Sequence, residues 1–348
     1  MKPFTYERPR RLEEAVRMAR QDGAMLYAGG TTMLDLMKLG VYRPRTVVDI
    51  TFLQEPSLRE IAVRGDRLRL GALATMHDTA EHADVKRLAP SMSESLWLAA
   101  SQQLRHMATL GGNVMQRTRD PYFRDPAWLQ LVGGRNRRRA ARPEDGVTTH
   151  GDGRQSEAML PGRLSAVLGT SGNDTASYPG DWAQALVAFD TTVEIAGPGG
   201  MRTLPFEQLH IRPADKRSET DFARLGAGDV ITAFSIPVTP ALRRSTYLKS
   251  RDRESYAFAN ASVAAGLELA GETVRDIRIG LGGVATVPWR AREAENMLRG
   301  QRLTDELIEA AGDAAFAGAI TNEHNAFKVP LGSSLIAEAI TRLRDMEG

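Results

Sequence analysis

Two glycine pairs constrain this chain more than any other feature of its sequence. The first stands in AGGTT at residues 28–32, after the apolar run AMLY, and the second in TLGGN at residues 109–113. Both are interpreted as a short apolar strand entering a turn, where glycine allows positive φ and lets backbone N–H groups approach an anion. A single glycine pair is more often only a tight turn, and neither segment matches GxGxxG or GxxxxGK[ST]. Two of them in one chain predict a pyrophosphate held from two sides.

Around the first pair, the hydrophobic pattern predicts a helix, a strand, a second helix and a second strand. Apolar residues recur at helical spacing over 12–20, and the run at 24–30 is typical of a strand that ends in a turn. Thr31 or Thr32 is a candidate N-cap for the next helix, and Gly40 ends it. With TVVDI at 46–50 as the second strand, we predict a compact subdomain over residues 1–55.

Residues 56–242 are predicted to form a second subdomain. IAVRGDRLRLGAL at 61–73 alternates apolar and polar residues around a Gly-Asp turn, which is typical of a β-hairpin. Helical patterns follow over 76–85 and 91–103. Further on, residues 178–197 read as a helix followed by a strand.

The last hundred residues predict a separate α+β domain over 243–348. Three apolar segments are interpreted as consecutive strands, at 247–251, 262–271 and 274–285. Helical patterns follow near 290–299, 303–317 and 333–345. The predicted fold class is therefore α+β, with two subdomains followed by a three-stranded sheet packed on helices.

Composition excludes several classes of protein. The 348-residue chain has no cysteine, which rules out disulfides, thiolate nucleophiles and cysteine-ligated clusters, and its six histidines show no HxxxH spacing. No GxSxG or HExxH motif is present. No apolar run approaches the roughly 18 residues of a spanning helix, and the N-terminus does not resemble a secretory signal. We therefore expect a protein folded in the cytoplasm, without a membrane span, a catalytic nucleophile or a metal of its own.

One local charge feature stands out against a net charge of only +2. Residues 135–142, RNRRRAAR, lie within a stretch from about 131 to 162 that is rich in Gly, Arg and Pro and is predicted to be an extended surface loop. This loop is either simply solvated, docks on an acidic partner surface or neutralises a phosphate. Nucleic acid is not an expected partner, because no nucleic-acid-reading module accompanies the arginines.

The glycine segments also carry a specific resemblance. YAGGTTMLDLMK (27–38) and MATLGGNVMQRTR (107–119) resemble the paired FAD-binding motifs in the medium subunits of xanthine dehydrogenase, carbon monoxide dehydrogenase and aldehyde oxidoreductases. SYPGDWAQALVAFDTTVEI (177–195), LKSRDRESYAFANASVAAGLEL (248–269) and IGLGGVATVPWRAREAE (279–295) extend the similarity, which covers nearly the whole chain. QRTRDPYFRD (116–125) is most similar to the branch typified by the periplasmic aldehyde oxidoreductase. The fold implied is a two-part FAD-binding domain of the vanillyl-alcohol-oxidase (PCMH) type with a C-terminal domain.

The resemblance implies FAD as the cofactor and gives roles by position. Residues 28–34 would wrap the diphosphate, the second segment would contact diphosphate and ribityl oxygens, Asp181 would bind a ribose or ribityl hydroxyl, and Lys249 would lie near the isoalloxazine. From the residues alone, Asp181 is also a candidate N-cap for a helix beginning at Trp182, and Lys249 a strand-end surface cation. The full set of implied cofactor-binding residues is Tyr27, Ala28, Gly29, Gly30, Thr31, Thr32, Met33, Leu34, Thr109, Gly111, Gly112, Asn113, Asp181 and Lys249.

One departure from the resembled branch changes the expected cofactors. That branch binds a [4Fe–4S] cluster through four cysteines, one at the position of Asp120 and one near Asp174, whereas this chain has none. We therefore expect no [4Fe–4S] cluster here, and the Arg-rich loop over 133–162 would be what remains of the cluster-bearing insertion. A hard-cation site at Asp120 and Asp174 is a minor alternative.

The resemblance implies a heteromeric molybdenum hydroxylase. A large subunit with molybdopterin would hydroxylate the organic substrate, a small subunit with [2Fe–2S] clusters would pass the electrons on, and FAD in this chain would reduce an external acceptor. One alternative is a structural subunit that has lost tight FAD binding. Another is a stand-alone flavin oxidase of the vanillyl-alcohol-oxidase type. The expected location is the cytoplasm, with co-export to the periplasm alongside a signal-bearing partner as the alternative.

Overall fold

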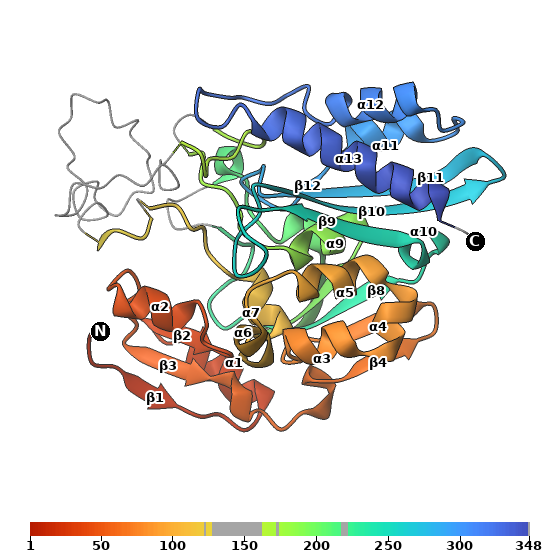
Figure 1. The fold of residues 1–348 in the computed structure, drawn as a ribbon. Helices are drawn as coiled ribbons and strands as arrows, with labels where there is room; N and C mark the ends of the chain where they lie inside the picture. The colour runs from red at the N-terminus through yellow and green to blue at the C-terminus, as the bar shows by residue number, and fades with distance from the viewer. Residues whose placement is uncertain (122, 127–161, 172–173, 217–221, 347–348) are drawn as a thin grey trace, which may run out of the picture.

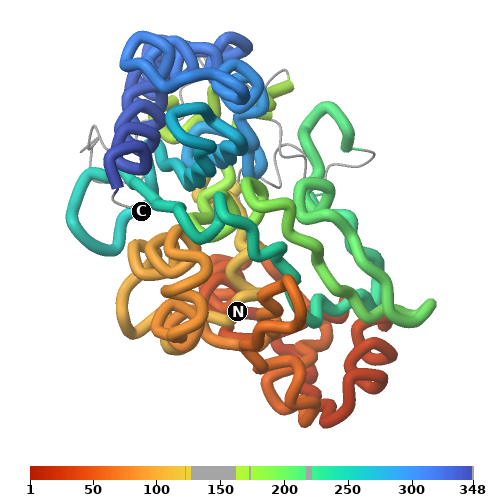
Figure 2. Tube along the Cα trace, turned by 90° about the vertical axis from the view of Figure 1, so that its right-hand side faces the viewer, coloured from red at the N-terminus to blue at the C-terminus, as the bar shows by residue number. Residues whose placement is uncertain are grey.

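The computed structural model describes residues 1–121, 123–126, 162–171, 174–216 and 222–346, and these residues form three sheets with helices between and around them. Figure 1 shows the N-terminal part and the first helices below, and the C-terminal sheet with its helices above. Figure 2, turned by 90°, shows the same stacking from the side. Most of the loop predicted over 131–162 lies outside the described residues.

The N-terminal subdomain is a three-stranded parallel sheet between two helices. Its elements are β1 (Thr5–Glu7), α1 (Leu12–Ala19), β2 (Ala24–Tyr27), α2 (Met33–Lys38) and β3 (Thr46–Asp49), and the sheet order is β1-β3-β2. Ala15 of α1 and Val48 of β3 are fully buried in one core, and Leu36 of α2 is fully buried as well. The two predicted helices and two predicted strands are confirmed, and Gly40 follows α2 with a φ of +77°.

A five-stranded antiparallel sheet forms the base of the middle part. Its order is β4-β5-β8-β6-β7, with β4 (Ile61–Arg64), β5 (Arg67–Gly71), β6 (Thr192–Gly197), β7 (Gly200–Pro205) and β8 (Val230–Pro237). The predicted hairpin over 61–73 is confirmed as β4 and β5, and Gly65 in its turn has a φ of +61°. The sheet thus joins the start of this part to its end, about 160 residues later.

Four short helices follow the hairpin where the sequence predicted two longer ones. They are α3 (Met76–Glu81), α4 (Ala83–Leu88), α5 (Pro90–Trp97) and α6 (Gln102–Met107). The helix predicted over 76–85 breaks because His82 adopts an extended backbone and its Nδ1 accepts from the N–H of Asp84, so it caps a new helix. The helix predicted over 91–103 ends at Trp97, since Ala100 has a φ of +50°.

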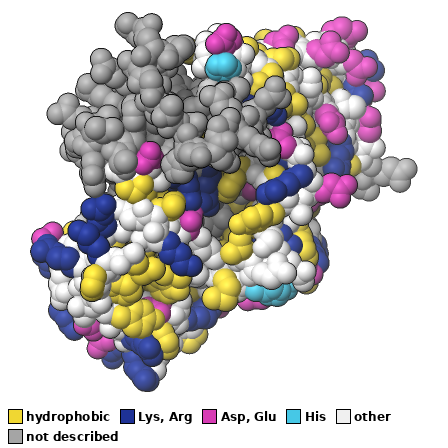
Figure 3. All heavy atoms as spheres, turned by 60° about the vertical axis from the view of Figure 1, so that its left-hand side comes forward, with side chains coloured by type: hydrophobic (Ala, Val, Ile, Leu, Met, Phe, Trp, Pro, Cys, Tyr) yellow, Lys and Arg dark blue, Asp and Glu magenta, His cyan; other side chains and the backbone are white. Residues whose placement is uncertain are grey.

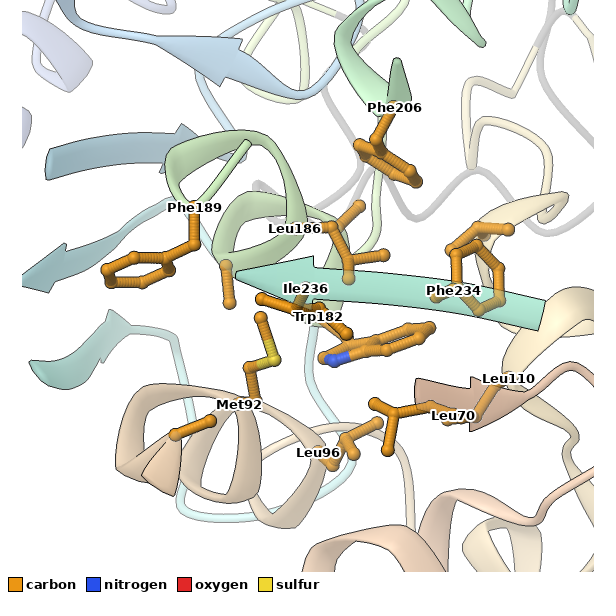
Figure 4. Close-up of a cluster of buried hydrophobic side chains, with 14 of the residues drawn as sticks. Leu70, Met92, Leu96, Leu110, Trp182, Leu186, Phe189, Phe206, Phe234 and Ile236 are labelled. Atoms are coloured by element: carbon orange, nitrogen blue, oxygen red, sulfur yellow. The ribbon is translucent and has the colours of Figure 1, made fainter. Parts of the chain in front are cut away.

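Helix α9 (Trp182–Ala188) lies at the centre of the molecule, and every one of its residues is buried. Figure 4 shows Trp182 surrounded by Met92 and Leu96 of α5, Leu70 of β5 and Phe234 of β8. The helix and strand predicted over 178–197 are therefore confirmed as α9 and β6, and α9 carries the packing between the middle sheet and its helices.

The C-terminal domain is a four-stranded antiparallel sheet covered by helices. The order is β12-β11-β10-β9, with β9 (Ser245–Ser250), β10 (Ala261–Ala270), β11 (Thr273–Gly282) and β12 (Trp289–Arg290), and the helices are α10 (Pro240–Arg243), α11 (Arg292–Leu298), α12 (Asp305–Ala314) and α13 (Lys328–Asp345). The three predicted strands are confirmed, and the sheet gains the two-residue strand β12. Figure 1 shows α11, α12 and α13 on its outer face.

Glycines let α9 pack tightly against the inner face of this sheet. A Cβ atom at Gly280 would lie 2.2 Å from the carbonyl oxygen of Gln184, and one at Gly282 would lie 1.7 Å from the Gln184 Nε2 atom. Real Cβ atoms do not approach other atoms so closely. The C-terminal sheet therefore rests on α9 only because β11 lacks side chains at these two positions.

Candidate functional site

The first glycine pair forms a turn between β2 and α2, as predicted. Gly30 has a φ of +71°, and a Cβ there would lie 2.4 Å from the Tyr27 ring. A Cβ at Gly29 would lie 2.0 Å from the carbonyl oxygen of Met107. The turn therefore lies directly against the backbone that leads into the second glycine segment, so the structure brings the two segments together.

The backbone amides of this turn are available for a ligand. The N–H groups of residues 29–33 donate no hydrogen bond to any other described residue, whereas the next amide, Leu34, donates to the Gly30 carbonyl at 3.0 Å. The helix α2 begins after Thr32, but the Thr32 side chain makes no capping bond. Within the part of the chain that the structure describes, these five successive amides have no acceptor, and such a row of amides can bind an anion.

The second glycine pair differs from its prediction. Instead of the expected strand and turn, this segment forms a short helix, α7 (Leu110–Val114). Thr109 caps the helix, because its side-chain oxygen accepts from the Gly112 N–H at 3.2 Å. Neither Gly111 nor Gly112 has positive φ. The prediction of a glycine turn was therefore wrong for this segment.

Asn113 lies at the end of this segment, and only the nitrogen of its side-chain amide has a partner among the described residues. Its Nδ2 atom donates to the Met76 sulfur at 3.4 Å, while its Oδ1 atom is buried and accepts from no described residue. This oxygen is thus able to accept a hydrogen bond from a bound ligand or from a water molecule. Met76 was missed by the sequence analysis, since nothing in its neighbourhood marks it as a contact of Asn113.

Asp181 and Lys249 form a buried ion pair. The Lys249 Nζ atom lies 2.9 Å from the Asp181 Oδ2 atom, with side chains 0% and 5% exposed, and Tyr247 donates to Oδ1 at 2.7 Å. Burial raises the pKa of Asp181, and the charge of Lys249 opposes that rise. The interpretation of Lys249 as a surface cation was wrong.

The carboxylate of Asp181 does not cap α9, although α9 begins at Trp182 as predicted. Asp181 has helical backbone angles, and its side chain faces Tyr247 and Lys249 instead of the first amides of the helix. Tyr247 was not predicted as a member of the site. The alternation of a strand places residues 247 and 249 on one face, so this contact could have been inferred once Lys249 was singled out.

Lys249 also ties the C-terminal domain to the end of α5. Its Nζ atom donates to the Leu98 carbonyl at 3.1 Å, and Arg251 donates to the same carbonyl oxygen at 3.1 Å. Leu98 lies in the segment that connects α5 to α6 and then to the second glycine pair. Strand β9 thus contacts both the start of α9 and the path to Asn113.

Asp120 and Asp174 line a single cavity of ≈ 80 Å³, whose wall also includes Arg117, Phe123, His210 and Lys216. Asp174 forms an ion pair with Lys216, and Arg117 lies between the rings of Phe123 and Phe222, 4.6 and 4.0 Å from their centroids. Among the described residues, no three His, Asp or Glu side chains are grouped so that they could hold a metal ion. The cation alternative at Asp120 and Asp174 therefore finds no ligand set in this part of the chain.

Comparison with known proteins identifies the family. A family model described as the FAD binding domain in molybdopterin dehydrogenase matches residues 2–239, and one described as the CO dehydrogenase flavoprotein C-terminal domain matches residues 245–342. The chain belongs to the flavin subunits of the molybdenum hydroxylase family. The resemblance seen in the sequence, the fold class and the oxidoreductase family are thereby confirmed.

Relatives of this flavin subunit cover it almost completely. The aldehyde oxidoreductase FAD-binding subunit PaoB of Escherichia coli is 35% identical over 99% of both chains. The carbon monoxide dehydrogenase medium chain of Hydrogenophaga pseudoflava is 26% identical over 90% of this chain and 86% of its own. A crystal structure of the Cu,Mo-CO dehydrogenase has a chain of the same fold, with a TM-score of 0.73, 21% identity and 99% coverage of both chains.

The residues of this flavin subunit fit an FAD molecule. The unpartnered amides of residues 29–33 suit phosphate oxygens, and the orphaned Asn113 Oδ1 atom requires a donor such as a sugar hydroxyl. Iron–sulfur clusters are a different case, because the sequence has no thiolate to hold one. Within the described residues, no helix combines the length and apolarity needed to cross a membrane.

Proposed function

We propose that this chain is the electron-transfer subunit of a heteromeric molybdenum hydroxylase, in which FAD takes electrons from the [2Fe–2S] clusters of a partner subunit and passes them to an external acceptor. The observation that carries the proposal is the row of unpartnered amides at residues 29–33, packed against the backbone at Met107. Bound FAD supplies the redox chemistry, and the chain binds and orients it. The membership of the family supports this assignment.

The site residues keep the roles that the sequence resemblance implies. Residues 28–34 hold the diphosphate, and residues 109 and 111–113 contact diphosphate and ribityl oxygens. Asp181 binds a ribose or ribityl hydroxyl, and Lys249 lies near the isoalloxazine. Because Lys249 and Asp181 neutralise one another, they place little net charge beside the flavin. The domain limits of this proposal are 1–55, 56–242 and 243–348.

The proposed partners are a molybdopterin-binding large subunit and a [2Fe–2S] small subunit. Apart from residues assigned to the FAD site, the N-terminal subdomain exposes several large apolar side chains, among them Phe4, Tyr6, Leu39 and Phe52. Figure 3 shows hydrophobic side chains gathered on the lower lobe. Such a patch is typical of a surface that a partner covers. For the compartment, the proposal keeps folding in the cytoplasm, with export alongside a signal-bearing partner as the alternative.

The test is the cofactor content of the full chain purified alone. We expect a yellow protein with about one FAD per chain and without the broad absorbance of iron–sulfur clusters. Colourless protein that cannot be reconstituted with FAD would favour the structural subunit and contradict the proposal. Oxidation of an organic substrate by this chain alone would favour the flavin oxidase.

Electron transfer requires a second measurement, because FAD binding alone does not demonstrate it. The chain is co-expressed with a molybdopterin-binding subunit and a [2Fe–2S] subunit of the same family, and the FAD absorbance is followed after aldehyde or another substrate is added without an acceptor. We expect the flavin to be reduced in the complex and to remain oxidised in the isolated chain. A flavin that stays oxidised in an active complex would contradict the electron-transfer role.

A further inference from the structure

Two stretches of the chain meet at two separate points. One stretch runs from Gly29 to Asp35 and the other from Met107 to Arg119, and we call them the first arm and the second arm. A Cβ at Gly29 would lie 2.0 Å from the carbonyl oxygen of Met107, so the arms are in backbone contact at one end. At the other end, the Arg119 Nη1 atom lies 3.4 Å from the Asp35 Oδ2 atom. The two arms therefore form a clamp that is closed at both ends.

The two ends of this clamp differ in strength. Gly29 has no room for even one methyl group, so that end is fixed by the packing of one main chain on the other. The side chain of Asp35, in contrast, is 41% exposed and that of Arg119 is 26% exposed. Ion pairs that are open to water contribute little to stability and are weakened by salt. The clamp therefore opens more easily at Asp35 than at Gly29.

A second arginine makes the weaker end depend on the Asp35 carboxylate. The Arg124 Nη2 atom lies 2.5 Å from the same Asp35 oxygen that Arg119 approaches. Burial lowers the pKa of Arg119, the neighbouring charge of Arg124 lowers it further, and the Asp35 carboxylate opposes the shift. Two guanidinium groups repel each other once the carboxylate between them is lost. Removing the charge of Asp35 should therefore drive this end apart.

The C-terminal domain contacts the same end of the clamp. The guanidinium group of Arg119 lies 4.8 Å from the centre of the Phe258 ring. Phe258 belongs to the loop 251–260 that connects β9 to β10. In this loop Tyr256 has a φ of +52°, and Arg253 donates to the Tyr256 carbonyl at 3.0 Å. Arg119 thus contacts both α2 and the C-terminal domain from the second arm.

We propose that Asp35, Arg119 and Arg124 form a latch that controls how fast FAD enters and leaves the chain. The amides of residues 29–33, which have no acceptor among the described residues, lie on the first arm between the fixed end and the latch. A ligand held by these amides leaves the clamp at the end that opens. This inference rests on the proposed function, in which the ligand is FAD, and it requires no contact between the latch and the cofactor.

The first test measures the rates of FAD uptake and release in the full chain stripped of FAD. Flavin fluorescence is followed after rapid mixing, with circular dichroism confirming that each variant is folded. In Asp35→Asn we expect both rates to rise by the same factor, at least about threefold, because an exposed ion pair is lost and two arginines are left without their carboxylate. Glu207→Gln is the matched control, since Glu207 is 36% exposed and pairs with Arg292 outside both arms. Its rates should equal those of the wild type.

The ratio of the two rates distinguishes a latch from a group that binds the cofactor. A latch lowers the barrier in both directions, so the dissociation constant of FAD stays the same. A rise in the release rate alone, with weaker binding, would assign Asp35 to the binding site and overturn the inference. Unchanged rates in Asp35→Asn would overturn it as well. A wild-type chain that binds no FAD would instead refute the proposed function, so the two failures are distinguishable.

Salt tests the latch in the wild-type chain without any substitution. Because dissolved ions screen exposed charges, raising the NaCl concentration should speed the release of FAD from the wild type. Asp35→Asn has no such ion pair left at the latch, so its release rate should depend less on salt. The same salt dependence in the two proteins would contradict the latch.

A covalent lock provides the converse test, because the chain has no cysteine of its own. Asp35→Cys and Arg119→Cys are combined, the protein is loaded with FAD, and a short bis-maleimide reagent joins the two thiols. We expect the linked protein to retain its FAD during dialysis that empties the same protein capped with a monofunctional maleimide. Equal loss of FAD from the linked and capped proteins would show that FAD leaves by another route and would overturn the inference.

Discussion

Lys249 and Asp181, which are 68 residues apart in the sequence, form an ion pair that is sealed from solvent, with 2.9 Å between Nζ and Oδ2. Each residue comes from a different domain: Lys249 lies on β9 of the C-terminal sheet, and Asp181 precedes α9 in the middle part. A buried charge is tolerated when its partner is present and is strongly destabilising when it is not. The pair therefore couples the two domains.

Removing both members of this pair should destabilise the protein by less than the sum of the two single losses. We expect Lys249→Met and Asp181→Asn each to lower the free energy of unfolding by about 3 kcal/mol, since each leaves one charged group buried with its counter-charge lost. The double variant should recover at least about 1 kcal/mol of the summed loss. Urea unfolding of the four proteins measures this coupling, and strictly additive losses would show that the two charges act independently.

The stability of the protein should depend on pH through His210. Burial lowers the pKa of His210 to about 4, although the Val114 carbonyl, which accepts from its Nε2 atom at 2.9 Å, opposes the shift. The unfolded chain, with a pKa of about 6.5, then binds more protons between pH 6.5 and pH 4. The contribution of neutral His210 to the free energy of unfolding is complete above pH 6.5. It is lost as the pH falls from 6.5 to 4, which lowers the free energy of unfolding by about 3 kcal/mol in total.

A His210→Gln variant is the matched control for this pH dependence. Its amide can still donate to the Val114 carbonyl but does not titrate. The free energy of unfolding, measured at pH 6.5, 5.5 and 4.5, should fall less steeply with decreasing pH in the variant. The difference between the two slopes corresponds to at most one proton taken up on unfolding. Equal slopes in the two proteins would assign the acid sensitivity to other groups.

Gly282 should be needed for the docking of α9 on the C-terminal sheet. A Gly282→Ala variant places a Cβ atom 1.7 Å from the Gln184 Nε2 atom, so Gln184 or the sheet must move. We expect a loss of about 2 kcal/mol, as in other overpacked cores. Gly318→Ala is the control, because no atom lies within 4 Å of its Cβ position. Thermal unfolding separates the two, and a Gly282→Ala protein as stable as the control would contradict the packing.

Replacing Gly30 should reduce FAD retention by more than replacing a glycine of similar backbone conformation elsewhere in the chain. In Gly30→Ala, a φ of +71° becomes unfavourable and the new methyl group meets the Tyr27 ring at 2.4 Å. Gly65→Ala, with a φ of +61° in the β4–β5 turn and open space around its Cβ, carries similar strain away from the site. We expect Gly30→Ala alone to purify with less than about a tenth of the wild-type FAD content, a loss equivalent to about 1.4 kcal/mol or more. Equal FAD content in the two variants would remove Gly30 from the site.

The first glycine segment could be predicted from the sequence because its structure depends on near neighbours. The apolar run of β2, the glycine at positive φ and the helix of α2 all lie within about 15 residues. The second segment could not, since the amides at the start of α7 are held by distant carbonyls: Leu110 donates to Ala74 and Gly111 to Ala72, on the far side of α3 to α6. Local pattern alone does not distinguish a glycine turn from the first turn of a capped helix.

The surroundings of Lys249 show the same limit. A lysine near the end of a strand is most often exposed, and only the folded chain brings Asp181 and the Leu98 carbonyl to its ammonium group. The breaks at His82 and Ala100 were missed for a related reason, because apolar spacing continues across both positions while the backbone turns there. Their conformations follow from the packing of short helices against one another.

The contacts made by β9 and β11 limit how members of this family can be recombined. A chimera that joins the first 242 residues of this chain to the C-terminal part of a relative would keep Asp181, Gln184 and the Leu98 carbonyl but would inherit whatever the relative carries opposite them. Such a hybrid would fold only if its donor supplied a lysine and a tyrosine on the first strand and glycines on the third. The unit that could be exchanged between relatives is thus the C-terminal sheet together with α9. A cut after residue 242 separates this sheet from α9.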